Sequence, residues 1–237
     1  MRDLMTVMWK ELAEFVGNTR SLRVFGVAVV LLGLLPLLSG HGLGTGATAE
    51  LRLLIAMYYV LFATLLVVAN TAPDLVLHER VGRTLDYLLT TRLPDWAIFG
   101  GKVLTATCVG YAAAVVAIAL QLLFTAALGG HGWTWLYLAV PAGRILTLAL
   151  PAVLSLYLSV VGTFVALRVG DQRSAYLVTV LAIGVVLAPL LLGWIPVQFT
   201  PAWLVKAAAA WAVLALALAA AGLRLFRRQM LVLYLQE

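Results

Sequence analysis

Long apolar runs separated by short polar segments dominate this chain of 237 residues. A helix needs roughly 17 to 25 mostly apolar residues to cross the hydrocarbon core of a bilayer. Six runs meet that requirement, so we predict six transmembrane helices. They cover about residues 22–38, 51–77, 97–128, 144–167, 175–192 and 204–223. The pattern therefore predicts an all-α polytopic membrane protein with a single transmembrane domain over residues 1–237.

A different pattern precedes the first span, because residues 3–17 alternate between apolar and polar at helical spacing. Leu4, Met5, Met8, Leu12, Phe15 and Val16 share one face of the predicted helix, and Asp3, Thr6, Lys10, Glu11 and Glu14 share the other. A helix with this division lies in the headgroup plane of a bilayer. We therefore expect an N-terminal interfacial amphipathic helix.

The longest polar interruption lies between the second and third spans, from His78 to Lys102. Leu85, Leu88 and Leu89 recur there at helical spacing between charged neighbours. This spacing predicts a short amphipathic helix over about residues 78–92. Such a helix either lies on the membrane without a partner or docks into a partner protein.

The composition supports a membrane protein, with 64% hydrophobic and 11% charged residues. A soluble domain carries roughly a quarter charged residues. The net charge of +6 does not indicate nucleic-acid binding, because no basic patch with interleaved aromatic residues occurs outside the spans. With the N-terminus inside, thirteen basic residues lie on the inner side and three on the outer. The positive-inside rule then predicts a multi-pass protein with both termini cytoplasmic, and we expect its location to be the plasma (inner) membrane.

Catalytic motifs are missing from the sequence. Gly101-Lys102 is not part of a phosphate-binding loop, and His78-Glu79 does not begin a zinc site. No nucleophile elbow occurs, and Cys108 is the single cysteine. We therefore expect no catalytic residue, no bound metal and no cofactor on this chain, which is not expected to be an enzyme.

Polar residues inside predicted spans are expensive and can mark a substrate path. Ser155, Ser159 and Thr163 recur every four residues and so share one face of the fourth span, while Gln121 is the strongly polar residue inside the third. One interpretation is that these four residues form a translocation face. The favoured alternative is close helix packing through small hydroxyl residues.

The polar segment resembles the signature of ABC-2-type permeases, the membrane subunits of a class of ATP-driven exporters. That signature reads Glu-Arg-x-x-Gly-Thr-Leu-x-x-Leu-Leu-x-Thr-Pro, with Gly-Lys about nine residues later. Here the matching positions are Glu79, Arg80, Thr84, Leu85, Leu88, Leu89, Thr91, Gly101 and Lys102. Arg83 stands at the usual glycine, Arg92 at the usual proline, and Ala97 where an acidic residue is common.

The resemblance implies that the helix over residues 78–92 is a coupling helix that docks into a groove of a cytosolic ATPase subunit. The implied contact residues are Glu79, Arg80, Arg83, Thr84, Leu85, Leu88, Leu89 and Thr91. It further implies pairing with a second permease, identical or related, and with two ATPase subunits that bind ATP and Mg²⁺. The expected function is substrate export by alternating access. The alternatives are an integral membrane assembly subunit or enzyme without transport activity, and a secondary carrier, which the few buried charges disfavour.

Overall fold

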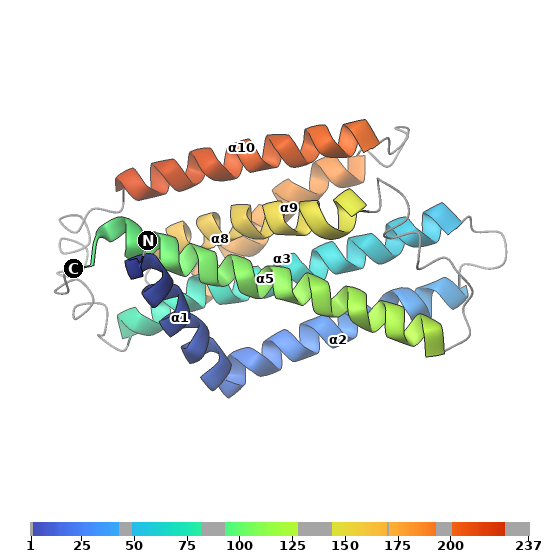
Figure 1. Ribbon diagram of the computed structural model, residues 1–237, viewed down its shortest axis with the longest axis horizontal. Coiled ribbons are helices and arrows are strands. Elements are labelled where there is room, and N and C mark those ends of the chain that lie inside the picture. The colour runs from blue at the N-terminus through green and yellow to red at the C-terminus, as the bar shows by residue number, and fades with distance from the viewer. Residues whose placement is uncertain are drawn as a thin grey trace.

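A computed structural model describes residues 2–42, 49–81, 93–127, 144–169, 171–192 and 201–225 (Figure 1). Nearly all of these residues are helical, and no strand occurs among them. The helices are α1 (Arg2–Gly17), α2 (Thr19–Gly42), α3 (Ala49–Val81), α5 (Asp95–Ala127), the π-helical segment η2 (Ile145–Ala149), α8 (Leu150–Arg168), α9 (Gln172–Leu192) and α10 (Pro201–Leu225). The predicted all-α class is confirmed for these ranges.

Four stretches within the described ranges are long and apolar enough to cross a membrane. They are Tyr58–Glu79 in α3, Asp95–Phe124 in α5, Thr147–Arg168 in η2 and α8, and Val205–Leu223 in α10. A fifth is obtained if Asp3–Gly17 and Ser21–Leu35, which are bent by 78° from each other, form one broken span. The chain is thus a helical protein suited to a membrane, and six spans stay a prediction.

Helix α3 lies at the centre of the bundle, where it packs against α2, α5, α8 and α9. In its apolar stretch Tyr58–Glu79, 72% is buried, whereas only 11% of Val205–Leu223 in α10 is buried. The main core joins α3 to α8 through side chains such as Leu65 and Leu154, both fully buried. Figure 1 accordingly shows α10 along the outer edge of the bundle.

The π-helical segment Ile145–Ala149 leads directly into α8 and precedes Pro151. A proline has no backbone N–H and its ring clashes with the preceding turn of a regular helix. A π turn joins each N–H to the carbonyl five residues earlier, and such turns occur mostly as single bulges inside α-helices. In this turn the backbone N–H of Leu150 donates to the carbonyl of Ile145, five residues earlier.

Helix α1 crosses the bundle obliquely near one end, while the other helices run roughly along its long axis (Figure 1). Val7, Glu11 and Phe15 face the bundle and are buried, whereas Met5 and Trp9 are exposed. The prediction of a helix over residues 3–17 is confirmed, but its faces differ from the expected division. Glu11 was expected on the exposed polar face and Met5 on the apolar face, and their environments are reversed.

The start of α9 is capped by Asp171. Its carboxylate accepts hydrogen bonds from the backbone N–H groups of Ser174, at 2.9 Å, and Arg173, at 3.0 Å, and from the Ser174 hydroxyl. Side-chain caps of this kind satisfy N–H groups that have no partner inside the helix. The hydrogen bonds from Ser174, followed by that from Arg173, lower the pKa of Asp171 below its usual value.

We expect Asp171→Ala to lower the thermal unfolding midpoint at neutral pH and to have a smaller effect in acid. Because the folded-state pKa is lower than the unfolded one, the stabilisation is present above the unfolded pKa and is lost as pH falls through the folded pKa. The measurement is the unfolding midpoint of detergent-purified protein between pH 7 and pH 3. Asp171→Asn, which retains a capping oxygen, should lose less at neutral pH. An equal loss for Asp171→Ala at every pH would contradict the role of the ionised cap.

Candidate functional site: a buried charge cluster

Four charged side chains from three helices meet in what we call the charge cluster. Lys10 and Glu11 belong to α1, Glu79 lies in the last turn of α3, and Lys102 lies near the start of α5. Glu11 is 1% exposed, and Glu79 and Lys102 are each 3% exposed. Lys10 is partly open, with 43% of its side chain exposed. The polar segment between α3 and α5 therefore begins and ends in the same cluster.

Lys102 occupies the centre of the charge cluster. Its Nζ donates to Oε1 of Glu11 at 2.8 Å and to the backbone carbonyl of Leu75 at 2.8 Å. It also forms an ion pair with Oε2 of Glu79 at 2.7 Å. An ammonium group has three N–H donors. Three oxygens from α1 and α3 therefore lie close to the buried Lys102, two as hydrogen-bond acceptors and one in an ion pair.

Glu79 is shared between two lysines. Its Oε1 accepts a hydrogen bond from Nζ of Lys10 at 2.9 Å, and its Oε2 faces Lys102. Lys10 also lies 3.4 Å from Oε1 of Glu14. Removing one partner from a buried ion pair leaves an uncompensated charge, which typically costs about 3–5 kcal/mol. Such a penalty opposes separation of α1, α3 and α5.

Burial and neighbouring charge shift the pKa values of Glu11 and Lys10 in opposite directions. Burial raises the pKa of the Glu11 carboxyl, against the opposing positive charge of Lys102. Burial alone would lower the pKa of Lys10, but its hydrogen bond and charge interaction with Glu79 raise that pKa above the usual value. Lys10 therefore remains protonated at neutral pH.

Close packing adds to the charge contacts between α1 and α5. A Cβ placed on Gly101 would lie 2.8 Å from Cβ of Val7, and one on Gly100 would lie 3.2 Å from Cδ1 of Leu4. One turn further along, the hydroxyl of Thr105 donates to the carbonyl of Met8 at 3.3 Å. The glycine pair thus lets α1 approach the start of α5 closely.

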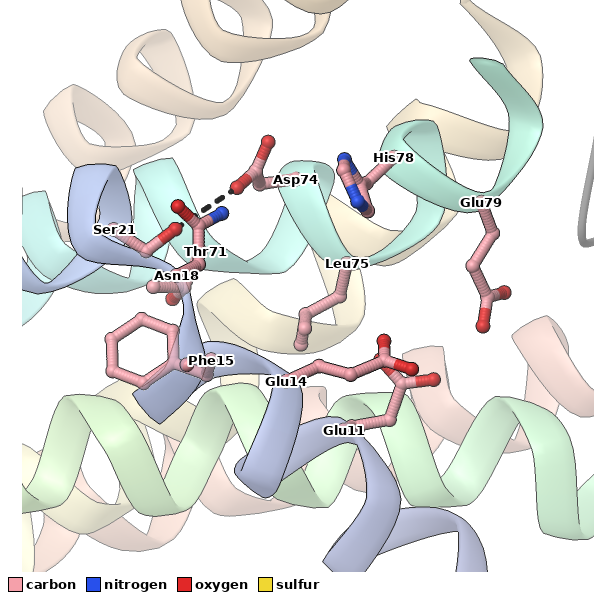
Figure 2. A pocket seen from close by; sticks show the side chains of 11 residues that line it. Glu11, Glu14, Phe15, Asn18, Ser21, Thr71, Asp74, Leu75, His78 and Glu79 are labelled. Atoms are coloured by element: carbon pink, nitrogen blue, oxygen red, sulfur yellow. Dashed lines mark hydrogen bonds between the residues drawn. The ribbon is translucent and has the colours of Figure 1, made fainter. Parts of the chain in front are cut away.

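A cavity of about 350 Å³ lies beside the charge cluster, between α1, the start of α2 and the end of α3. Figure 2 shows Glu11 and Glu14 of α1 on the side opposite Leu75 and Glu79 of α3. The residues that line this cavity are Glu11, Glu14, Phe15, Gly17, Asn18, Ser21, Thr71, Asp74, Leu75, His78 and Glu79. Asp74 accepts hydrogen bonds from Ser21 at 3.4 Å and from Gln172 of α9 at 2.8 Å. The ranges seen in the structure contain no group of three His, Cys, Asp or Glu suited to hold a metal ion.

Among the predicted ATPase-contact residues, the structure describes the surroundings of the Glu79 side chain. This side chain is buried in the charge cluster. Arg80 lies in the last turn of α3, and its side chain is not described. Arg83, Thr84, Leu85, Leu88, Leu89 and Thr91 fall in residues 82–92, outside the described ranges. The predicted coupling helix over about 78–92 is thus described only for residues 78–81, as the end of α3, and its docking stays a prediction.

The predicted translocation residues are all buried. Ser155 and Ser159 are 0% exposed, and Thr163 and Gln121 are each 1% exposed. Ser159 accepts a hydrogen bond from Thr107 of α5 at 3.2 Å, while both serines donate to carbonyls in their own helix. The contact of Ser159 with Thr107 and the position of Ser155 beside Gly110 place both serines at the α5–α8 interface, as the packing alternative predicts.

Gln121 lies away from these serines along the bundle. Ser155 is close to Gly110 of α5, and Gln121 follows Gly110 by eleven residues, or about 16 Å at 1.5 Å per helical residue. The structure therefore does not bring Gln121 together with Ser155 and Ser159. Whether any of these residues lines a transport path stays a prediction.

Lys10 and Glu11 are the residues of this site that reasoning from the sequence did not find. Helical periodicity placed both on the polar face of α1, where charged residues are ordinarily solvated. One signal was present: Lys102 follows the first five residues of the third predicted helix, and a lysine inside a helix bundle needs an acidic partner. The identity of that partner depends on how three separate helices pack.

Comparisons with known proteins identify no family for the chain, so a functional assignment depends on the residues described above. No protein-family model matches the chain, and no curated protein sequence shows a significant match to it.

Proposed function

We propose that the chain is the permease subunit of an ABC-2-type exporter. It pairs with a second permease and two cytosolic ATPase subunits and moves a substrate across the plasma membrane by alternating access. ATP and Mg²⁺ bind to the ATPase subunits, and the coupling helix over about residues 78–92 docks there. Movement of that helix biases the spans between two arrangements of similar free energy.

The charge cluster is the observation that best supports this proposal. Glu79 and Lys102, from the two ends of the signature-like segment, form an ion pair at 2.7 Å. The cluster thereby fixes both flanks of residues 82–92 on the same buried support. A docking helix held at both ends can transmit force to α3 and α5, whereas a loosely tethered segment would absorb the displacement. The four apolar stretches suited to a membrane agree with a permease.

The proposal predicts that purified chain brings with it a cytosolic ATPase and that Leu85→Asp with Leu88→Asp removes it. Amphipathic helices dock through apolar anchors, and a carboxylate in an apolar groove is strongly disfavoured. We expect recovery of the ATPase subunit and of ATP hydrolysis to fall at least about tenfold, equivalent to 1.4 kcal/mol of binding. The measurement is affinity purification from the native host, followed by quantitative mass spectrometry and an ATP hydrolysis assay.

The matched control is Leu85→Met with Leu88→Met, which keeps both positions apolar and should retain the ATPase. If wild-type chain purifies without an ABC ATPase subunit, or if the aspartate pair retains it fully, the coupling function is wrong. The alternative, an assembly subunit or membrane enzyme without transport, would then be favoured.

A further inference from the structure

We infer that α1 is a positioning element of the coupling apparatus: through the charge cluster it moves together with the ends of α3 and α5 as one unit. This inference rests on the proposed function for its role in transport, but the physical attachment of α1 can be tested without it. Lys10, Glu11 and Lys102 are then positioning residues, which act on the coupling segment through Glu79.

The contacts connect α1 to both flanks of the coupling segment by adjacent residues. Lys10 binds Glu79 on the α3 side at 2.9 Å, and Glu11 binds Lys102 on the α5 side at 2.8 Å. Glu79 and Lys102 are also paired with each other. A displacement of either flank alone must therefore break a buried ion pair. Moving all three helices together breaks none.

Packing beneath these ion pairs leaves little room for sliding. Val7 fills the space where Gly101 lacks a side chain, and Thr105 is hydrogen-bonded to the backbone of Met8. Packed interfaces move between discrete arrangements rather than deforming continuously. We therefore expect α1 and the start of α5 to move together without a change in the contact between them.

Helix α1 also offers a route from the coupling segment to α2. The chain bends at Asn18, and the described parts of α1 and α2 meet at 78°. The rings of Phe15 and Phe25 pack edge to face across this bend, with centroids 6.3 Å apart. Ala28 and Val29 of α2 belong to a core cluster shared with α3 and α5. Motion of α1 is thus passed to α2 as well.

The first test measures attachment by hydrogen exchange on the isolated full-length chain in detergent. We expect Glu11→Gln and Lys10→Gln each to speed amide exchange over residues 7–13 at least about tenfold, because α1 then opens more often from its support. The matched control is Glu14→Gln, since Glu14 is half exposed and its carboxylate pairs, at 3.4 Å, with Lys10 of its own helix. Unchanged exchange in both cluster variants would overturn the inference, whether or not an ATPase binds.

The second test asks whether α1 stays on α5 during the cycle. Leu4→Cys and Gly100→Cys, in a Cys108→Ser background that removes the single native cysteine, place two thiols where the helices touch. We expect ATP hydrolysis by the purified permease–ATPase complex to stay within about twofold after oxidation to the disulfide. A loss of tenfold or more that reductant reverses would show that α1 must leave α5, and the inference would be wrong.

These outcomes separate the inference from the proposed function. Absence of an ABC ATPase from the purified chain would contradict the proposed function, while the exchange measurement would still decide whether the charge cluster holds α1. Conversely, an active complex that is blocked by the disulfide would retain the proposed function and exclude movement as one unit.

Discussion

Replacing Lys102 with methionine is expected to destabilise the protein by about 3–5 kcal/mol, the usual cost of leaving buried charge without its partner. Methionine has a similar length but provides no charge or N–H donor. Glu11 would lose its 2.8 Å partner, and Glu79 would lose its 2.7 Å ion pair. Since folded proteins are commonly stable by only about 5–15 kcal/mol, this loss should be visible as a large drop in unfolding midpoint.

Thermal or denaturant unfolding of the detergent-purified protein measures this effect. Lys206→Met provides the matched control, because Lys206 is exposed on α10 and its replacement should change stability by less than about 0.5 kcal/mol. Adding Glu11→Gln to Lys102→Met should recover part of the loss, since one buried charge is then removed. Equal stability of Lys102→Met and Lys206→Met would show that the charge cluster contributes little to the fold.

Substitution of Gly110 is expected to disrupt the packing of the central helices. A Cβ on Gly110 would overlap Cγ2 of Val68 in α3 and lie 3.0 Å from Oγ of Ser155 in α8. Val68 and Ser155 are both 0% exposed, so neither side chain has free space nearby. Gly110→Ala should cost about 1–3 kcal/mol, the usual range for overpacking, and Gly110→Leu more.

Gly184→Ala is the matched control for this prediction. Gly184 is also inside a helix, α9, but a Cβ there would meet nothing within 4 Å. Alanine at an unhindered helical position is typically favoured over glycine by about 1 kcal/mol. Unfolding midpoints in detergent should therefore move in opposite directions for the two substitutions. A neutral Gly110→Ala would mean that α3 and α8 can separate locally at little cost.

Both predictions concern contacts that hold α3 in the bundle. One tests close packing, and the other tests buried ion pairs. Gly110 sets how closely α5 approaches α3 and α8, whereas Lys102 fixes the end of α5 relative to α1 and the end of α3. Under the proposed function, Lys102 helps to transmit force from the coupling helix to α5. Gly110 maintains the packing of α5 against α3 and α8, to which that force is transmitted. A variant at Gly110 should therefore lose stability without losing the α1 attachment measured by hydrogen exchange.

The sequence by itself determined the helical character of the chain. Hydrophobic runs long enough for a membrane and the periodicity of residues 3–17 follow from local geometry, which fixes which residues share a face. They located α1 to within one residue at its start, and they placed the apolar stretches of α3, α5, α8 and α10. Small hydroxyl residues at four-residue spacing also indicated close packing of α8, as Ser155 and Ser159 show.

Only the tertiary structure decided what each face meets. Helical periodicity assigned Glu11 to a polar face, but it could not show that this face lies against Lys102 rather than water. Glu79 and Lys102 are twenty-three residues apart in sequence, and their pairing requires α3 and α5 to lie side by side with α1 across their ends. Burial makes such charges depend on partners from other helices, and a one-dimensional pattern contains no information on those distances. The polar segment could therefore be located from the sequence, whereas its attachment to α1 could be seen only in the packed fold.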